Sequence, residues 1–411
     1  MNTVTVIATD LLTPLAAYLR LRETGTASFL LESVEQGRLG RYSFVGCGSR
    51  LLTFAEAETC GEPVVGYLSY EHAATLEPTV PVPSAGPDLP ESRFLVAETL
   101  VRFDHARGAA DVLCGDAAEV THLLAGPQPP LPSGGGSSRN GTRRLPSRFD
   151  YERSVERAKS HIRAGDVFQV VLPQRAERRT PVTPLALYRA LRRVNPSPYL
   201  FLLDVDGLAL VGSSPETLVR ADGSRASLNP IAGTTRAGPG DAERLLASEK
   251  ERAEHVMLVD LGRNDLSRVC RPGTVRVERF MATEQYSHVT HLVSEVVGEL
   301  AERRTPFELL RACFPAGTVS GAPKVRAMQI ISELEGYRRG IYAGAVGYAL
   351  PGGVMDTCIA IRTLVLREGV AYLQAGGGIV VDSDPAAEHQ ECLQKLAALE
   401  TAIELAEKEQ R

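Results

Sequence analysis

The sequence lacks the features that mark membrane-spanning and secreted proteins. No uninterrupted apolar run reaches the roughly 20 residues that a membrane-spanning helix needs. The N-terminal segment MNTVTVIATD has neither the basic start nor the apolar centre of a signal peptide. We therefore expect a cytoplasmic protein with no membrane association.

Cysteine pairs and excess positive charge are also absent. The seven cysteines are scattered and none belongs to a C-x-x-C pair, which favours reduced thiols over a disulfide framework or a zinc site. The formal net charge of −5 gives no support for nucleic-acid binding, because such proteins usually show a basic patch. What the sequence does have is 411 residues with 44% hydrophobic content, enough to bury a large core in one or two domains.

One stretch of biased composition divides the chain. Between residues 126 and 144, proline, glycine, serine and arginine dominate and apolar residues become scarce, as in a mobile connector. Short apolar strands and helical periodicities occur on both sides of it. We predict an N-terminal region over 1–124, a linker over 125–147 and a C-terminal region over 148–411.

The end of the C-terminal region combines several features of a ligand site. Residues 356–366 and 370–381 flank Arg367-Glu368-Gly369, and this pattern predicts two strands of a hairpin. Arg362 is a lone cation on the first strand. The second strand ends in Ala375-Gly-Gly-Gly378, where the backbone can approach a ligand without interference from Cβ atoms.

Two pairs of glutamates share the same helical spacing. Glu388 and Glu391 are followed by Lys395 on one face of a helix that the capping sequence DSDP opens, and Glu251 and Glu254 repeat the spacing upstream. Two helices with such pairs could face one another across Mg²⁺, which favours carboxylate oxygens. The alternative for either pair alone is a solvated helix face.

Three single residues are candidates for a role inside the protein. Gln169 lies within a β-branched strand, where a buried amide needs a partner or a ligand. Glu216 follows an apolar strand, where burial could raise its pKa and make it a proton donor, although a turn residue is the alternative. His291, beside Leu and Val, is by its surroundings alone a core residue.

Several longer motifs occur in a fixed order. They are Gly212-Ser-Ser-Pro-Glu216, Pro230-Ile-Ala-Gly-Thr234, EHVMLVDLGRND over 254–265, FPAGTVSGAPK over 314–324 and DTCIAIR over 356–362. Together they resemble the chorismate-utilising enzymes, specifically anthranilate synthase component I, almost continuously over residues 149–400. Leu30-Leu-Glu-Ser33 and Gly40-Arg-Tyr-Ser-Phe44 extend the resemblance into the N-terminal region.

The resemblance implies an α+β fold. A β-rich core of two packed sheets would be surrounded by helices, and the N-terminal and C-terminal regions would pack as one unit with chorismate and Mg²⁺ between the sheets.

The resemblance also implies roles for individual residues. The metal region would comprise Glu251, Glu254, Glu388 and Glu391, with Glu254 and Glu391 as direct ligands. The substrate-binding residues would be Gly233, Thr234, Tyr342, Arg362, Gly376, Gly378 and Lys395.

The reaction follows from further residues that the resemblance identifies. Glu216 would protonate the departing C4 hydroxyl, His291 would serve the second step, and Thr318 would help to order the same region. Isochorismate and salicylate synthases carry lysine in place of Gln169, and aminodeoxychorismate synthases carry lysine in place of Ala232. Because both lysines are absent, ammonia would add at C2.

The implied activity is that of a Mg²⁺-dependent lyase, which converts chorismate and ammonia to anthranilate and pyruvate through 2-amino-2-deoxyisochorismate. One alternative is an enzyme of specialised metabolism that releases this aminated intermediate, since Thr290 replaces the usual Met beside His291 and the segment after Gly238 is shorter than usual. A non-catalytic metabolite-binding protein is a further alternative.

Two partners are also implied. No cysteine lies in a Gly-x-Cys-x-Gly nucleophile turn, so ammonia would come from a separate glutamine amidotransferase subunit. Tryptophan is a candidate inhibitor, which suits a role in tryptophan biosynthesis. The residues that match the tryptophan-binding region are Leu31, Glu32, Ser33, Pro198, Tyr199 and Leu200, the last in place of the usual Met.

Overall fold

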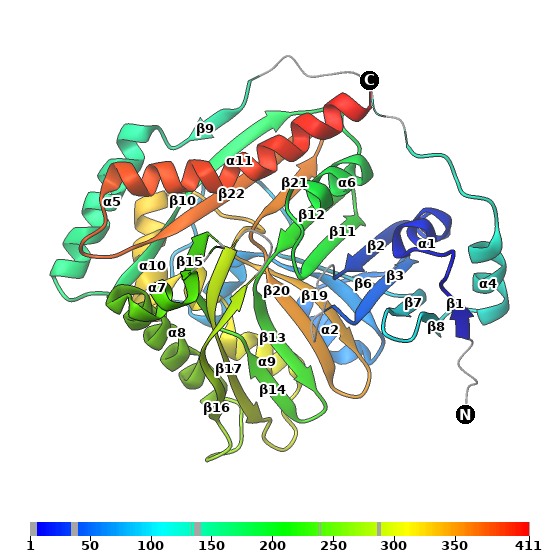
Figure 1. The fold of residues 1–411 in the computed structure, drawn as a ribbon, viewed down its shortest axis with the longest axis horizontal. Helices are drawn as coiled ribbons and strands as arrows, with labels where there is room; N and C mark the ends of the chain where they lie inside the picture. Colours follow the sequence, from blue (N-terminus) through cyan, green and yellow to red (C-terminus); the bar gives the residue numbers. More distant parts are fainter. Residues whose placement is uncertain are drawn as a thin grey trace.

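The computed structural model describes residues 6–33, 40–132, 134, 141–236, 238, 240–285 and 289–410 (Figure 1). Within this part of the chain, two antiparallel sheets form the core. The first sheet runs in spatial order β1 (Val6–Ala8), β8 (Ala109–Cys114), β7 (Thr99–Asp104), β3 (Tyr42–Gly48), β2 (Ala27–Glu32), β11 (Tyr199–Val205), β12 (Leu208–Ser214), β21 (Thr363–Arg367), β22 (Val370–Ile379), β10 (Gln169–Arg179) and β18 (Gly321–Ala322), with β9 (Arg143–Leu145) paired to β10.

The second sheet, like the first, contains strands from both the N-terminal and the C-terminal regions. Its spatial order is β15 (Ile231–Arg236), β17 (Val289–Glu299), β14 (Arg225–Leu228), β13 (Thr217–Asp222), β20 (Val354–Ile359), β19 (Ala345–Leu350), β5 (Val64–Leu68), β6 (Ser92–Val96) and β4 (Leu51–Leu52), with β16 (Arg276–Gln285) paired to β17. Because β2 pairs with β11 and β5 pairs with β19, the N-terminal and C-terminal regions are hydrogen-bonded to each other in both sheets.

Helices cover the outer faces of the sheets. They are α1 (Pro14–Leu21), α2 (Phe54–Cys60), η1 (Tyr70–His72), α3 (Ala73–Leu76), α4 (Ala117–Ala125), α5 (Arg148–Arg163), α6 (Pro184–Val194), α7 (Asp241–Ala247), α8 (Glu249–Ser267), α9 (Pro306–Cys313), η2 (Gly317–Val319), α10 (Lys324–Glu335) and α11 (Pro385–Glu409). The long helix α11 crosses β22 and packs against α6 on the first sheet, as Figure 1 shows. The predicted α+β fold with two packed sheets is therefore confirmed.

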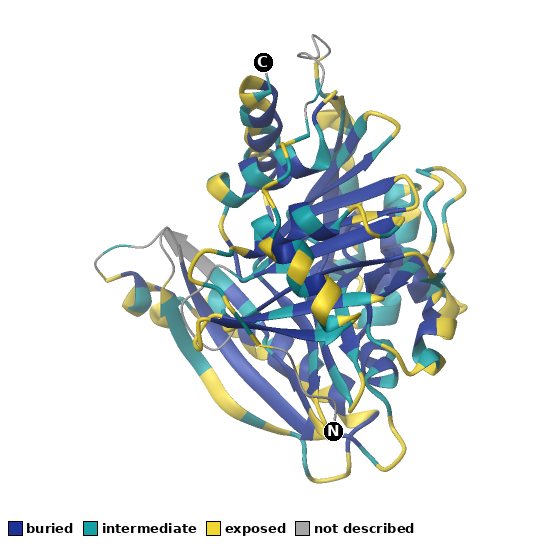
Figure 2. Cartoon of the chain, turned by 90° about the vertical axis from the view of Figure 1, so that its right-hand side faces the viewer, coloured by how far each residue is buried: buried dark blue, intermediate teal, exposed yellow. Residues whose placement is uncertain are grey.

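Strands at the centre of the first sheet are apolar on both faces, because one face packs against helices and the other against the second sheet. On β11, Leu200 and Leu202 belong to the apolar cluster under α1, α6 and α11, whereas Phe201 and Leu203 belong to the cluster between the two sheets. This alternation follows from the two-residue period of a strand. Figure 2 shows the result, with buried strands inside and exposed residues on loops and outer helix faces.

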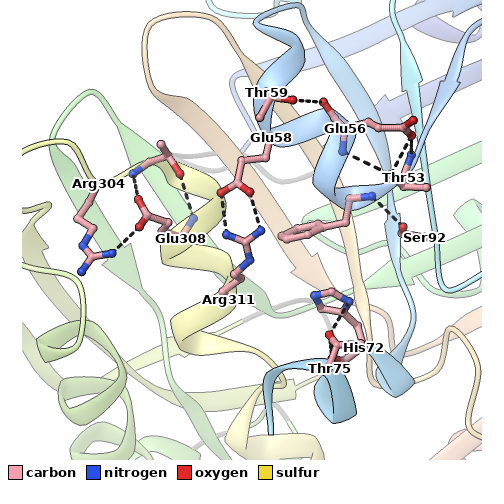
Figure 3. Close-up of polar contacts among 12 residues, drawn as sticks. Thr53, Glu56, Glu58, Thr59, His72, Thr75, Ser92, Arg304, Glu308 and Arg311 are labelled. Atoms are coloured by element: carbon pink, nitrogen blue, oxygen red, sulfur yellow. Dashed lines mark hydrogen bonds and ion pairs between the residues drawn. The ribbon is translucent and has the colours of Figure 1, made fainter. Parts of the chain in front are cut away.

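The N-terminal region also holds the helices of the second sheet in place (Figure 3). A capping box opens α2 at Thr53 and Glu56, and another opens α9 at Thr305 and Glu308, so both helix starts have their first N–H groups satisfied. Arg311 of α9 then donates two hydrogen bonds to the Glu58 carboxylate of α2, over 2.8 and 2.5 Å. This fork-to-fork geometry fixes the orientation of the two helices.

One predicted strand is wrong. Residues 356–366 were expected to form one arm of a hairpin, but β20 ends at Ile359 in the second sheet and β21 begins at Thr363 in the first. Both halves are apolar, so the sequence pattern does not reveal the change of sheet. The hairpin itself is present, because Arg367 pairs with Val370 around Glu368 and Gly369.

Two smaller observations complete the fold. The strand β9 lies inside the segment predicted as a linker and pairs with β10. None of the helices in the described part of the chain combines the length and the apolar character that a membrane span requires.

Candidate active site

Two short links carry the chain between the sheets, and they lie side by side. Glu216 is in the link from β12 to β13, and Arg362 is in the link from β20 to β21. The Ile359 N–H donates to the main-chain carbonyl of Glu216 over 3.0 Å, which ties the two links together. Arg362 has a φ of 50°, a left-handed conformation that is uncommon for a residue with a side chain. A carboxyl group and a cation therefore lie in adjacent links between the sheets, within electrostatic reach of each other.

The Glu216 carboxyl group is buried. Its side chain accepts a hydrogen bond from Thr318 Oγ1 over 2.9 Å, and the residue is 9% exposed. Burial raises the pKa of Glu216 to about 7, although the Thr318 hydrogen bond and the charge of Arg362 oppose this rise. A carboxyl group that keeps its proton near neutral pH can act as a general acid.

The His291 ring is a candidate base on the adjacent strand β17. Its Nδ1 lies 3.1 Å from the Gly233 carbonyl oxygen, and since a carbonyl can only accept, Nδ1 carries the proton in this bond. Burial lowers the pKa of His291, and the positive charge of Arg362 lowers it further, whereas the Gly233 hydrogen bond raises it. The neutral ring then has its lone pair on Nε2 and can accept a proton. Thr234 pairs with His291 through the backbone, and its side chain lies outside the described atoms.

Thr290, which precedes His291, interacts with a different part of the fold. Its hydroxyl donates to the Asp241 carboxylate at the start of α7, and its side chain is buried. Adjacent side chains on a strand point to opposite faces. Thr290 therefore anchors α7 and is directed away from the face that carries His291.

Gln169 lies at the start of β10 and connects the first sheet to α8. Its Nε2 donates to Glu254 Oε1 over 3.1 Å. Its Oε1 is buried and has no hydrogen-bond partner among the described residues. A Cβ atom at Gly378 would lie 2.0 Å from Gln169 Nε2, so the amide needs glycine at this position of β22. The free oxygen can accept a hydrogen bond from a ligand.

The two pairs of glutamates lie on α8 and α11 and interact electrostatically. Burial raises the pKa of Glu251, and the charges of Glu254 and Glu391 raise it further. Burial also raises the pKa of Glu388, and the charge of Glu391 contributes. A Cβ atom at Gly377 would lie 2.9 Å from Glu388 Oε2 and 3.7 Å from Glu391 Oε1. The α11 pair therefore borders the glycine-rich end of β22, with the α8 pair within electrostatic reach.

Three of the predicted substrate residues, Tyr342, Gly376 and Lys395, lie together at this same end of β22. Lys395 Nζ donates to the Gly376 carbonyl oxygen over 2.8 Å and forms an ion pair with Glu391 at 2.7 Å. The Tyr342 hydroxyl oxygen is 2.8 Å from where a Gly376 Cβ would be. Tyr342 is 8% exposed and the Lys395 side chain is 46% exposed, so the site extends from the interior to the surface.

The four glutamates fit a magnesium ion by their chemistry. Of the residues that the structure describes, no three His, Cys, Asp or Glu side chains are grouped as a bound metal would require. The glutamates thus share a region without converging on one point. Carboxylate oxygens are the ligands that Mg²⁺ favours, and a cation would offset the repulsion that helps to raise the pKa values of Glu251 and Glu388.

A separate cavity, of about 480 Å³, is lined by all six residues assigned by resemblance to tryptophan binding. Glu32 is buried there, accepts a hydrogen bond from the Tyr188 hydroxyl and lies 3.4 Å from Arg192 Nη1. Tyr199 donates to Asp356 over 2.9 Å. The structure therefore unites residues 31–33 and 198–200, which are far apart in the sequence. The residues named for this cavity from the sequence are Leu31, Glu32, Ser33, Pro198, Tyr199 and Leu200.

Sequence reasoning missed two polar residues near the site. Ser383 donates to Glu388 over 2.7 Å, and the capping sequence at the start of α11 could have indicated it. Arg339 is buried next to Tyr342 in space and pairs with Glu335, four residues earlier at the end of α10, and no helical pattern in the sequence indicates this pair because the helix ends between the two residues.

Comparisons with known proteins show the family of the chain. The family model described as chorismate binding enzyme matches residues 18–401, so the chain belongs to the chorismate binding enzyme family. The chain is 44% identical to anthranilate synthase component 1 of Thermus thermophilus, over 97% of this chain and 96% of that protein. It is also 44% identical to anthranilate synthase component 1 of Streptomyces coelicolor, over 97% and 88% respectively. The resemblance to anthranilate synthase component I is confirmed.

Solved structures show the same fold. Anthranilate synthase component I from Streptococcus pneumoniae superimposes with a TM-score of 0.80 at 32% identity, over 96% of this chain and 99% of that chain. The menaquinone-specific isochorismate synthase from Escherichia coli superimposes with a TM-score of 0.77 at 23% identity, over 97% of this chain and 94% of that chain, and this likeness concerns the fold alone.

Replacing Glu216 should change the pH dependence of stability. The pKa of Glu216 rises from 4.5 to about 7 on folding, so its contribution to stability is complete below pH 4.5 and is lost as the pH rises to about 7. Glu216→Gln keeps the shape without the charge, and we expect it to stabilise the protein by about 3 kcal/mol well above neutral pH and little at acid pH. Urea unfolding across this range measures the difference. The exposed Glu302→Gln is the control, and an equal effect of Glu216→Gln at both pH extremes would contradict the assignment.

Proposed function

We propose that the chain is the large, amine-adding component of anthranilate synthase, and that it converts chorismate and ammonia to anthranilate and pyruvate. The observation that carries this proposal is that the charge of Arg362, in the link next to that of Glu216, acts on both the buried Glu216 carboxyl and the His291 ring. One site thus holds a protonated acid and a neutral base. Identities of 44% to two anthranilate synthase components support the same activity.

In the first step, ammonia adds at C2 of chorismate and the C4 hydroxyl leaves as water. Protonated Glu216 supplies the proton that this hydroxyl needs in order to leave. Gln169 is neutral, and its buried Oε1 can accept an N–H hydrogen bond from the incoming ammonia. Arg362 can hold a substrate carboxylate, because a guanidinium group offers two parallel hydrogen bonds.

In the second step, the C2 proton is removed and the enolpyruvyl ether is cleaved, which leaves anthranilate and pyruvate. Neutral His291 is the base for this step. Thr290, the unusual neighbour, donates to Asp241 and is directed to the face of the strand opposite to that of His291. The geometry therefore supports the complete reaction over release of 2-amino-2-deoxyisochorismate.

Mg²⁺ would be held by Glu254 and Glu391, with Glu251 and Glu388 around them. The ion would supply positive charge that anchors the ring carboxylate of the substrate beside these glutamates. Lys395 would provide a further positive charge at the same place. Two features support this magnesium site: the glutamates supply carboxylate oxygens, and their negative charges repel one another, a repulsion that a bound cation would offset.

Ammonia would come from a separate glutamine amidotransferase subunit in the cytoplasm. The relatives named above are called component 1, which suits an enzyme of more than one component.

The cavity around Glu32 would bind tryptophan as an end-product inhibitor, since a buried carboxylate can receive an amino group and the cavity has apolar walls for an indole ring.

The isolated chain should consume chorismate with Mg²⁺ and an ammonium salt, and should not use glutamine. Anthranilate fluorescence and pyruvate, measured by coupling to lactate dehydrogenase, should increase in equal amounts. Loss of chorismate without pyruvate would instead identify an enzyme that stops at the aminated intermediate. No loss of chorismate would favour a non-catalytic binding protein, and turnover of glutamine by the pure chain would contradict the separate partner.

Glu391→Gln should abolish turnover while leaving the fold intact, because the change removes a charge at nearly constant volume. Circular dichroism checks the fold, and activity is measured over a range of Mg²⁺ concentrations. Glu404→Gln on the same helix is the matched control. Full activity of Glu391→Gln at ordinary Mg²⁺ would remove this residue from the metal site.

Tryptophan should inhibit ammonium-dependent turnover, and Glu32→Gln should weaken this inhibition because it removes the charge that receives the amino group. The measurement is a titration of tryptophan against the rate of anthranilate formation. Inhibition that is equally strong in Glu32→Gln would place the tryptophan site elsewhere.

A further inference from the structure

Arg339 is a buried cation that none of the proposed catalytic steps uses. Its side chain is 1% exposed, and it forms an ion pair with Glu335 at the end of α10. Both Arg339 Nε and Nη2 donate to this carboxylate, over 3.1 and 2.5 Å. The guanidinium group also lies 4.4 Å from the ring centroid of Tyr70 and 5.7 Å from that of Tyr342.

The same guanidinium group holds two segments that carry candidate catalytic residues. Arg339 Nη1 donates to the carbonyl oxygen of Val319 over 2.7 Å, and Val319 follows Thr318 in η2. Arg339 Nη2 donates to the carbonyl oxygen of Val171 over 2.9 Å, two residues after Gln169 in β10.

The backbone of Arg339 reaches a third segment. Its carbonyl oxygen accepts a hydrogen bond from Gln374 Nε2 over 2.7 Å, and Gln374 lies in β22 two residues before Gly376. One residue thus joins η2, β10 and the glycine-rich end of β22. Lysine could replace the charge of Arg339, but a single ammonium group cannot reproduce the planar fork that spans Glu335 and both carbonyls.

We propose that Arg339 is a positioning residue for the first reaction step: it fixes η2 so that Thr318 stays in hydrogen-bond contact with Glu216 and thereby sets the protonation of this acid. The proposal rests on the proposed function of the site. Arg339 acts through Thr318, whose bond to Glu216 measures 2.9 Å.

Other charged groups also lie around Glu216, and the structure shows their positions. Arg362 faces it from the neighbouring link. Asp265 of α8 lines the same small cavity, of about 50 Å³, and is held by Lys324 of α10 at 2.7 Å. The Thr318 hydrogen bond lowers the pKa of Glu216, so loss of this bond should raise that pKa.

The test compares Arg339→Lys with Thr318→Val and with the double variant. We expect kcat of Arg339→Lys to fall about tenfold, a change that corresponds to loss of one hydrogen bond in the transition state, while KM for chorismate changes little. The alkaline limb of its pH profile should move to higher pH, since that limb reports loss of the proton from the acid. Thr318→Val should show the same shift, and the double variant should show no further shift.

Two controls separate positioning from general loss of structure. Arg338→Lys changes the adjacent, more exposed arginine and should leave the pH profile unchanged. If Arg339→Lys does not fold, Glu335→Asp displaces the guanidinium group while keeping the charge pair, and it should shift the profile in the same direction. Additive shifts in the double variant, or an unshifted profile in a folded variant, would overturn the proposal.

A readout without turnover keeps this proposal separate from the proposed function. Infrared difference titration of the Glu216 carboxyl, with Glu216→Gln as the blank, gives its pKa directly. A raised pKa in Arg339→Lys supports the positioning role even if chorismate is not the substrate. An unchanged pKa overturns that role even if the wild-type protein forms anthranilate.

Discussion

The adjacent crossings of the chain between the two sheets determine where chemistry can occur. A strand that changes sheet must leave its ladder for a few residues, and both crossings do so in the interior, at Glu216 and at Arg362. The backbone there is stabilised by the Ile359 hydrogen bond across the two links. Because helices and sheets enclose this region, an acid and a cation are held where water has little access.

Burial has opposite effects on the acid and on the base of this site. It favours the neutral form of each group, so the pKa of Glu216 rises to about 7 and the pKa of His291 falls. Arg362 acts against the first shift and in favour of the second. Near neutral pH, the site therefore holds a proton donor and a proton acceptor together, as a reaction with one protonation and one deprotonation requires. The ends of the site, at Lys395 and the glutamates, are more exposed and can admit an anionic substrate.

Much of this site could be predicted from the sequence, because its motifs are long and their residue types are informative. The glycines of β22, the glutamate pairs and Gln169 were named from the sequence, and the structure brings them together. The change of sheet at Arg362 could not be predicted, since the residues on both sides are equally apolar. The bonds of Arg339 also escaped prediction, because their acceptors are main-chain carbonyls, which no side-chain pattern reveals.

The central claim is that substrate binds between the sheets at Glu216 and Arg362. A crystal structure of the Glu216→Gln variant with chorismate and Mg²⁺ tests it most directly, because removal of the acid should allow the substrate to remain intact. The account predicts the C4 hydroxyl within hydrogen-bond distance of the side chain at position 216, a carboxylate on Arg362, and Mg²⁺ between α8 and α11. Chorismate bound elsewhere, for example only in the cavity around Glu32, would contradict it.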